Sequence, residues 1–281
     1  MNKKRIALAL SLVFIFCSIT NISVKSETLS NDVNYYAVII AVERFEGNLS
    51  YNDTVCIDED AQDMYDMLIS KENWDEENIK LLINENASKN SIKSAVTDWL
   101  KNKTDENDIV LFYYSGHGWK MPINKINYGN AYIFSYNSSE PRFGQDEDIS
   151  DKELDSWLDS LAYGKMVVIL DSCYSGRMLK IRQKNRVVLA AGGKYLLCPV
   201  DGDKNLDNGI FTYFLLQGFK GVADLNNDNI VTAEEAFRYA RVPTFIFSFF
   251  KQFPFKTGIG PQVPYMYDRC AGDITLIQYK N

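Results

Sequence analysis

Two short polar segments carry the residue types that nucleophilic catalysis needs. Cys173 lies in the segment Asp171-Ser-Cys-Tyr-Ser-Gly176, directly after an apolar run that begins at Met166. His117, the only histidine of the chain, follows a second run of mostly apolar residues, Asp108 to Tyr114. A thiol and an imidazole that meet in a fold can act as a nucleophile and its base. The two segments therefore predict a Cys/His pair.

The elements that position this pair are predicted to be two buried parallel strands. An apolar run of strand length, bounded by small residues, is typical of a strand that is buried on both faces. The carboxyl ends of parallel strands form the edge of a sheet at which ligands and catalytic groups collect. A single buried cysteine is usually a small hydrophobe, and a single histidine is usually structural. Because Cys173 and His117 each follow a predicted strand and precede a glycine, we favour a catalytic role for the pair over these structural roles.

The order of the other elements predicts a mixed α/β fold. Strand patterns alternate with apolar residues at helical spacing, which predicts a parallel sheet with right-handed crossovers. The predicted strands are Tyr35 to Val42, Asn78 to Ile83, Ala131 to Tyr136, Val187 to Ala191 and Asp273 to Ile277. The predicted helices are Ile57 to Ile69, Ile92 to Leu100, one opened by the capping box Ser150 to Glu153, and Phe211 to Phe219. Phe245 to Phe250 is expected to pack on the body of the protein.

The composition and the N-terminal segment indicate an exported globular protein. The chain has 281 residues, 46% of them apolar, and its net charge of −7 argues against a nucleic-acid-binding surface. Lys3, Lys4 and Arg5 precede the apolar run Ile6 to Ile19, which is typical of a signal peptide. We expect residues 1–26 to be removed, which leaves a secreted or cell-surface protein without a membrane span.

The segments YYSGHG and ILDSCYSG resemble the histidine and cysteine motifs of the caspase-like cysteine peptidases, the clan of caspases, metacaspases, legumains and gingipains. The resemblance extends from Tyr35 to Ile277. It implies a three-layer α/β/α sandwich with a mostly parallel sheet of about six strands. It also implies one peptidase domain over 27–281: a large portion at 35–176, a basic linker at 177–186 where such enzymes cleave themselves, and a small portion at 187–281.

The same resemblance implies a role for each motif residue. Cys173 would attack the scissile carbonyl group, and His117 would manage the proton. The backbone N–H groups of Gly118 and Cys173 would form the oxyanion hole. The expected activity is that of an exported cysteine endopeptidase acting on peptide or protein substrates.

The similarity to metacaspases also implies a pocket for the residue before the scissile bond. Asp60, Ser115 and Asp171 match the positions that line this pocket. Carboxylates in a partly desolvated pocket favour Arg or Lys. Asp60 could instead be a carboxylate that stabilises the N-terminus of its helix. Lys194, if it points inward, would favour Asn or an acidic residue.

A second pattern, Asp224 to Glu235, matches the ligand spacing of an EF-hand calcium loop. Asn229 replaces the usual glycine, and asparagine tolerates the left-handed conformation that this position needs. We expect calcium and no organic cofactor, although a solvated polar turn has the same composition. The ligands would be Asp224, Asn226, Asp228, Ile230 through its carbonyl group, Thr232 and Glu235.

Three alternatives remain open from the sequence. A legumain-like Asn-specific peptidase or a transpeptidase would use the same cysteine chemistry. A catalytically silent, calcium-binding interaction module would keep the scaffold without the reaction. If Cys173 stays a free thiol, at most one disulfide can form among Cys56, Cys198 and Cys270 after export.

Overall fold

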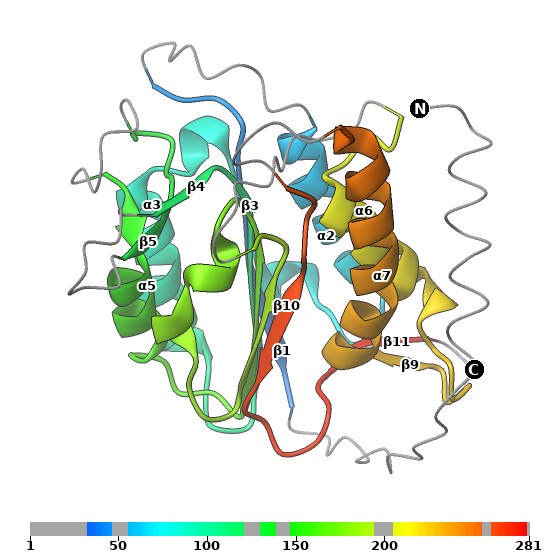
Figure 1. The fold of residues 1–281 in the computed structure, drawn as a ribbon. Coiled ribbons are helices and arrows are strands. Elements are labelled where there is room, and N and C mark those ends of the chain that lie inside the picture. Colours follow the sequence, from blue (N-terminus) through cyan, green and yellow to red (C-terminus); the bar gives the residue numbers. More distant parts are fainter. Residues whose placement is uncertain are drawn as a thin grey trace.

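A six-stranded, mainly parallel sheet forms the centre of the protein in the computed structural model (Figure 1). The structure describes residues 33–46, 56–120, 130–138, 147–193, 205–254 and 260–279. The predicted signal peptide, Lys194 and Cys198 lie outside these residues. The strand order is β10-β8-β7-β3-β1-β2, and only β10 runs antiparallel to its neighbour. The strands are β1 (Tyr35–Val42), β2 (Ile79–Ile83), β3 (Ile109–Gly116), β7 (Lys165–Asp171), β8 (Arg186–Ala190) and β10 (Tyr265–Asp268).

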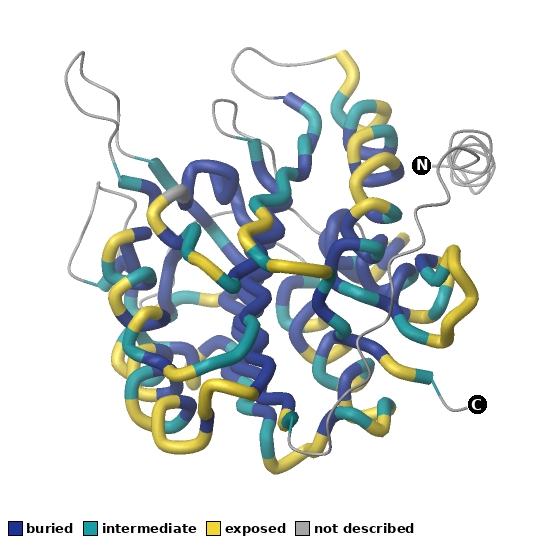
Figure 2. Tube along the Cα trace, turned by 90° about the horizontal axis from the view of Figure 1, so that it is seen from below, coloured by how far each residue is buried: buried dark blue, intermediate teal, exposed yellow. Residues whose placement is uncertain are grey.

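Helices cover both faces of this sheet, as Figure 1 shows. One face carries α2 (Ile57–Ile69), α6 (Ile210–Gln217) and α7 (Ala233–Gln252). The other carries α3 (Lys89–Ser94), which continues into a π-helix (Ala95–Leu100) and α4 (Lys101–Lys103), and α5 (Asp151–Leu158). Successive residues of β1 alternate between the two apolar layers, because side chains of a strand point to opposite faces. The expected three-layer arrangement is confirmed. Figure 2 shows buried residues through the middle of the molecule and exposed ones at its periphery.

Two small sheets lie outside the central one. β4 (Gly118–Lys120), β5 (Ala131–Ile133) and β6 (Ile149–Ser150) form an antiparallel sheet directly after His117. β9 (Ile230–Thr232) pairs with β11 (Thr275–Gln278). The remaining short elements are 3₁₀ turns at Glu76–Asn78, Asn84–Asn86, Ser175–Arg177 and Leu179–Ile181 and a π-helical turn at Gly218–Val222. No helix within the described residues is long and apolar enough to cross a membrane.

The structure refines two expectations about the C-terminal portion. The last predicted strand exists as β11, but it pairs with β9, and the sixth strand of the central sheet is β10, which the sequence pattern did not indicate. Phe245 to Phe250, which was expected to pack on the body, belongs to α7, and only part of it packs there. Phe247 points into the core, whereas Phe245 and Phe250 are 40% and 57% exposed. The helical rotation of 100° per residue explains why one apolar run divides between core and surface.

The basic segment 177–186 connects β7 to β8 through the last two 3₁₀ turns. Its end residues Arg177 and Arg186 are buried, and Lys184 is exposed. The fully buried Arg186 forms ion pairs with Asp155 at 3.3 Å and Asp159 at 2.9 Å. Its guanidinium group also donates to the Ile181 carbonyl oxygen at 2.9 Å. Arg186 therefore fixes this connection to α5.

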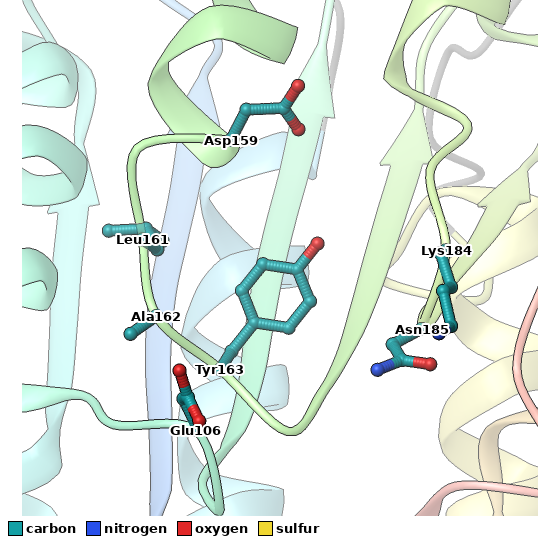
Figure 3. Close-up of a pocket in the computed structure, with 7 residues that line it drawn as sticks. All are labelled: Glu106, Asp159, Leu161, Ala162, Tyr163, Lys184 and Asn185. Atoms are coloured by element: carbon teal, nitrogen blue, oxygen red, sulfur yellow. The ribbon is translucent and has the colours of Figure 1, made fainter.

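A shallow pocket of about 450 Å³ lies beside this ion-pair network (Figure 3). Tyr163, just before β7, and Asn185, just before β8, contribute to its wall. The pocket thus lies at the amino ends of these strands, opposite the edge at which Cys173 and His117 follow their strands. It is lined by Glu106, Asp159, Leu161, Ala162, Tyr163, Lys184 and Asn185.

Arg186→Ala is expected to lower the free energy of unfolding by about 2–5 kcal/mol, because it removes a large, fully buried side chain together with its ion pairs and its hydrogen bond to Ile181, and leaves a cavity. The matched control is Arg44→Ala, which removes an exposed pair with Glu85 at 3.7 Å. This control should change the free energy of unfolding by less than about 1 kcal/mol. Urea denaturation of both variants measures the difference, and equal effects would contradict a structural role for Arg186.

Candidate active site

The register between β3 and β7 places His117 and Cys173 at equivalent points of the sheet edge. Ser115 pairs with Asp171 in this parallel ladder. His117 and Cys173 each follow two residues later, beyond the carboxyl ends of adjacent strands. Because neighbouring strands of a sheet lie about 4.8 Å apart, the two segments leave the sheet side by side. The structure thus brings together the two strand ends that the sequence singled out.

The backbone around Cys173 forms a tight turn. Tyr174 has a φ of 56°, a left-handed conformation that is uncommon for a residue with a side chain. The Gly176 N–H donates to the Gly192 carbonyl oxygen at 3.0 Å, and the Gly192 N–H donates to Ser175 Oγ at 2.8 Å. Cys173 itself forms no disulfide within the described part of the chain and is 7% exposed. The end of β8 therefore holds the cysteine turn in place.

Aromatic side chains hold His117. The Tyr114 hydroxyl donates to the His117 carbonyl oxygen at 2.9 Å, and Phe45 stacks on the imidazole at a ring-centroid distance of 5.8 Å. Phe134 lies against the same ring at 6.3 Å. Burial in these surroundings lowers the pKa of the His117 imidazole to about 4, because the charged form loses solvation. The ring is therefore neutral at pH 7 and can accept a proton.

Gly118 packs directly against the cysteine turn. A Cβ atom placed on Gly118 would lie 2.2 Å from the Cys173 carbonyl oxygen and 2.9 Å from Ser172 Oγ. Only a residue without a side chain allows this approach. The contact brings the backbone of one predicted oxyanion donor against the residue that carries the other.

Gly118→Ala is expected to lower kcat/KM roughly 10²-fold, since relieving the overlap displaces the candidate catalytic residues Cys173 and His117 by a fraction of an ångström or more. Gly193→Ala is the matched control, because a Cβ atom there would meet nothing within 4 Å. Steady-state kinetics of the two variants, with circular dichroism spectra to verify folding, tests this prediction. A Gly118→Ala variant that is as active as Gly193→Ala would show that this contact is not needed.

The three predicted pocket residues lie together beneath this edge. Asp60, Ser115 and Asp171 are fully buried, and Ser115 Oγ donates to Asp60 Oδ2 at 2.7 Å. Gly209 lies between the carboxyl groups: a Cβ atom there would be 2.8 Å from Asp60 Oδ2 and 3.0 Å from Asp171 Oδ2. Its N–H donates to Asp60 Oδ1 at 2.8 Å. Two acidic side chains from α2 and β7 thus meet at the start of α6.

The N-terminus of α6 stabilises this carboxylate pair. The Thr212 N–H and hydroxyl donate to Asp171 Oδ2 at 3.1 and 2.8 Å. Asp171 Oδ1 is buried and accepts no hydrogen bond within the described part of the chain. Burial raises the pKa of Asp171 to about 6, against the opposing effect of the Thr212 bonds. Burial, and then the charge of Asp171, raise the pKa of Asp60 well above its usual value. An unpaired buried carboxylate oxygen is a site at which a cation would be favourable.

Sequence reasoning did not identify four residues of this region: Phe45, Tyr114, Gly209 and Thr212. Asn208-Gly209 before an apolar helix is a recognisable helix-start signal. The sequence could therefore have marked the N-terminus of α6, but not the acidic groups that approach it. The aromatic contacts of His117 depend on tertiary packing and had no local signal.

The predicted calcium loop has some of the local geometry that its pattern requires. Asn229 adopts a left-handed φ of 64°, as the sharp turn of such a loop demands. Asp224 accepts hydrogen bonds from the N–H groups of Asp228 and Asn229 at 3.2 and 3.1 Å. Glu235 Oε2 accepts from the Thr232 N–H in a capping box, and Glu235 Oε1 lies 3.5 Å from Asn226 Nδ2. Ile230 begins β9. The oxygen-rich side chains suit a hard cation such as Ca²⁺.

Comparisons with known proteins agree with this arrangement. The family model described as "Metacaspase, peptidase C14 domain" matches residues 36–182, more than half of the chain. Metacaspase-4 of Arabidopsis thaliana is 26% identical over 140 residues, which are 43% of this chain and only 29% of that relative. A crystal structure of a Geobacter sulfurreducens protein has a TM-score of 0.58 at 15% identity, covering 85% of this chain and 95% of that one, and so supports the fold. The chain belongs to the metacaspase family of caspase-like cysteine peptidases, peptidase C14.

Proposed function

We propose that the protein is an exported cysteine endopeptidase that uses a Cys173/His117 dyad and cleaves peptides or proteins after Arg or Lys. The observation that carries the proposal is the equivalent placement of the two residues, each two positions beyond the paired Ser115 and Asp171. Membership in a cysteine peptidase family supports the chemistry. Lys3 to Arg5, followed by an apolar run, supports export.

In the proposed reaction, neutral His117 takes the proton of the Cys173 thiol as the sulfur attacks the scissile carbonyl carbon. The Gly118 and Cys173 N–H groups would stabilise the negative charge that develops on the carbonyl oxygen. Protonated His117 then gives its proton to the leaving amine, and a thioester remains. A water molecule, activated by His117, hydrolyses this thioester and restores the thiol.

The proposed specificity rests on the carboxyl groups of Asp60 and Asp171. A substrate guanidinium or ammonium group would supply the partner that buried Asp171 Oδ1 lacks among the described residues. Both carboxyl groups are fully buried. A substrate side chain can therefore reach these two carboxyl groups only when the parts of the protein that cover them move.

The experiment that tests the proposal is cleavage of fluorogenic peptides with Arg, Lys, Asn or Asp before the scissile bond, with and without calcium. The Cys173→Ala variant is the control for contaminating peptidases. Cleavage of only the basic peptides, lost in the variant, is the expected result. Cleavage of only Asn or Asp peptides would preserve the dyad and contradict the basic pocket. No cleavage of any peptide in the presence of calcium and reductant would contradict the proposal as a whole.

We also propose that Asp224 to Glu235 binds Ca²⁺ and so stabilises the C-terminal portion. The oxygen ligands at EF-hand spacing and the left-handed Asn229 support this proposal. The ion would connect the turn before β9 to the first turn of α7, since Asp224 and Glu235 lie at these two places.

Calcium at about 100 times its Kd is expected to stabilise the protein by roughly 2.7 kcal/mol, which corresponds to a rise in Tm of roughly 5–10 °C. The double variant Asp224→Asn/Asp228→Asn should lose this rise in differential scanning fluorimetry with calcium or a chelator. Glu43→Gln is the matched control. Glu43, Asp58 and Glu59 form a second acidic cluster that could hold a metal ion, with ligand atoms within 4.8 Å of one another. A rise that survives the double variant but disappears in Glu43→Gln would place the ion elsewhere.

A further inference from the structure

A buried arginine lies four residues after Cys173, in the turn Ser175–Arg177. Arg177 is 7% exposed, and its backbone N–H donates to the Tyr174 carbonyl oxygen at 2.8 Å. Its guanidinium group forms no hydrogen bond and no ion pair within the described part of the chain, whereas buried Arg186 has two carboxylate partners. A buried cation is unfavourable unless an anion pairs with it. Arg177 therefore offers a charged group that a negatively charged ligand would stabilise.

A second cation, Lys120, lies near Arg177. Lys120 ends β4, three residues after His117, and is paired with Ala131 of β5. The strand β5 in turn contacts the turn that carries Arg177. Burial, and then the charge of Arg177, lower the pKa of the Lys120 ammonium group, which agrees with this proximity. Two positive charges beside the same strand favour the binding of an anion between them.

The ring of Tyr174 connects these cations to the candidate nucleophile. Tyr174 directly follows Cys173, and the Lys120 ammonium nitrogen lies 4.6 Å from the centroid of its ring. Trp119 packs edge-on against the same ring at a centroid distance of 6.3 Å. Cys173 and Tyr174 are buried, and Trp119 packs on them. The ammonium group of Lys120 is thus separated from Cys173 by a single aromatic residue.

The two cations and the proposed pocket for Arg or Lys lie on opposite sides of the central sheet. Asp60 belongs to α2, and Asp171 accepts hydrogen bonds from Thr212 of α6, so the pocket lies on the side that these helices cover. Figure 1 shows β4 and β5 on the other side, with α3 and α5. A peptide with its basic side chain on the first side and its scissile carbonyl group at Cys173 would continue over the second side, where β4 follows His117.

We propose that Arg177 and Lys120 bind the carboxylate of an Asp or Glu directly after the scissile bond. This inference rests on the proposed peptidase function and narrows its substrate class to peptides in which a basic residue is followed by an acidic one. A guanidinium group can bind a carboxylate through two parallel N–H donors, and a neighbouring ammonium group adds to the attraction. The bound carboxylate would also neutralise the buried charge of Arg177.

The first test uses two internally quenched peptides that differ only after the cleaved Arg, one with Asp and one with Asn. The unmodified protein is expected to cleave the Asp peptide with a kcat/KM about 10-fold higher. This preference should disappear in Arg177→Gln and persist in part in Arg177→Lys. Arg182→Gln is the matched control from the same basic segment, because the Arg182 guanidinium lies over the Tyr267 ring at 4.8 Å, and it should keep the preference. Both peptides are cleaved by one preparation, so partial unfolding of a variant does not change the ratio.

The second test, alkylation of Cys173 in the full chain, does not depend on peptidase activity. Iodoacetate carries a carboxylate that iodoacetamide lacks, and mass spectrometry measures the rate at which each reagent modifies Cys173. The ratio of the iodoacetate rate to the iodoacetamide rate should be about threefold lower in Arg177→Gln than in the unmodified protein. Arg182→Gln should leave this ratio unchanged.

The two tests distinguish failure of this inference from failure of the peptidase proposal. Equal cleavage of the Asp and Asn peptides by the unmodified protein, or a preference for Asp that Arg177→Gln retains, would overturn the inference and leave the peptidase proposal intact. If neither peptide is cleaved, the peptidase proposal fails and the alkylation ratio decides whether the anion site exists. A ratio that does not depend on Arg177 would then overturn the anion site as well.

Discussion

Cys173→Ala is expected to lower kcat/KM for a peptide with Arg before the scissile bond at least about 10⁴-fold, because the reaction would lose the proposed nucleophile. His117→Ala should cause a loss of similar size, since nucleophile and base act as a unit and their effects do not add. The double variant should therefore be no less active than either single variant. Initial rates on the Arg peptide, with thermal denaturation curves to verify folding, measure all three.

The other described cysteines provide the control for this prediction. Cys56 and Cys270 are free thiols in the structure. Burial and neighbouring carboxylates raise the pKa of Cys56 to about 11 and that of Cys270 to about 12. Both remain protonated and poorly nucleophilic at pH 7. Cys56→Ala and Cys270→Ala should therefore retain the activity of the unmodified protein, and a loss as large as that of Cys173→Ala would contradict the assignment of the nucleophile.

Asp171→Asn is expected to reduce kcat/KM for an Arg peptide roughly 10²–10³-fold, because a buried charged partner of the substrate cation is lost. Cleavage of the matching citrulline peptide, which has the same shape without the charge, should change much less. Asp60→Asn should act in the same direction. Asp63→Asn is the matched control, because Asp63 is an acidic residue of the same helix that is not one of the predicted pocket residues. It accepts a hydrogen bond from Asn208 Nδ2 at 3.0 Å. A fall of equal size for Arg and citrulline peptides would indicate disturbed folding or positioning, and would contradict a charge-based pocket.

The same pair predicts a pH dependence. Because burial raises the pKa of Asp171 to about 6 and raises that of Asp60 well above its usual value, the pair holds protons at low pH and loses them as pH rises. The ionised pair binds a cation more strongly. The ratio of kcat/KM for Arg to that for citrulline should therefore increase from pH 5 to pH 8. In Asp171→Asn, this increase should become smaller.

The parts of the site that lie on strands could be predicted from the sequence. The apolar runs before His117 and Cys173 indicate buried strands, and strands that are parallel neighbours must bring their carboxyl ends to one edge. The local sequence pattern and the parallel topology together therefore predict that these two segments meet. They also predict that Ser115 lies next to Asp171. The start and end of each predicted strand differ from those in the structure by a few residues at most.

The parts that depend on distant segments could not be predicted. Gly209 lies between two carboxyl groups because α6 inserts its N-terminus beneath the sheet edge, and nothing near Gly209 in the sequence encodes those partners. The edge strand β10 is short and only partly buried, so it lacks the continuous apolar run of the central strands. The run Phe245 to Phe250 has the apolar composition of a core segment. Only the way in which α7 packs on the rest of the protein shows that Phe245 and Phe250 face outward.

The most direct test of the dyad is covalent labelling by a peptidyl-Arg acyloxymethyl ketone, followed by mass spectrometry of the digested protein. Such a reagent alkylates an activated thiol at the site that recognises its Arg side chain. The account predicts one label, on Cys173, which disappears in His117→Ala and persists in Cys56→Ala. A label on Cys56 or Cys270, or a label on Cys173 that does not depend on His117, would contradict the proposed Cys173/His117 site.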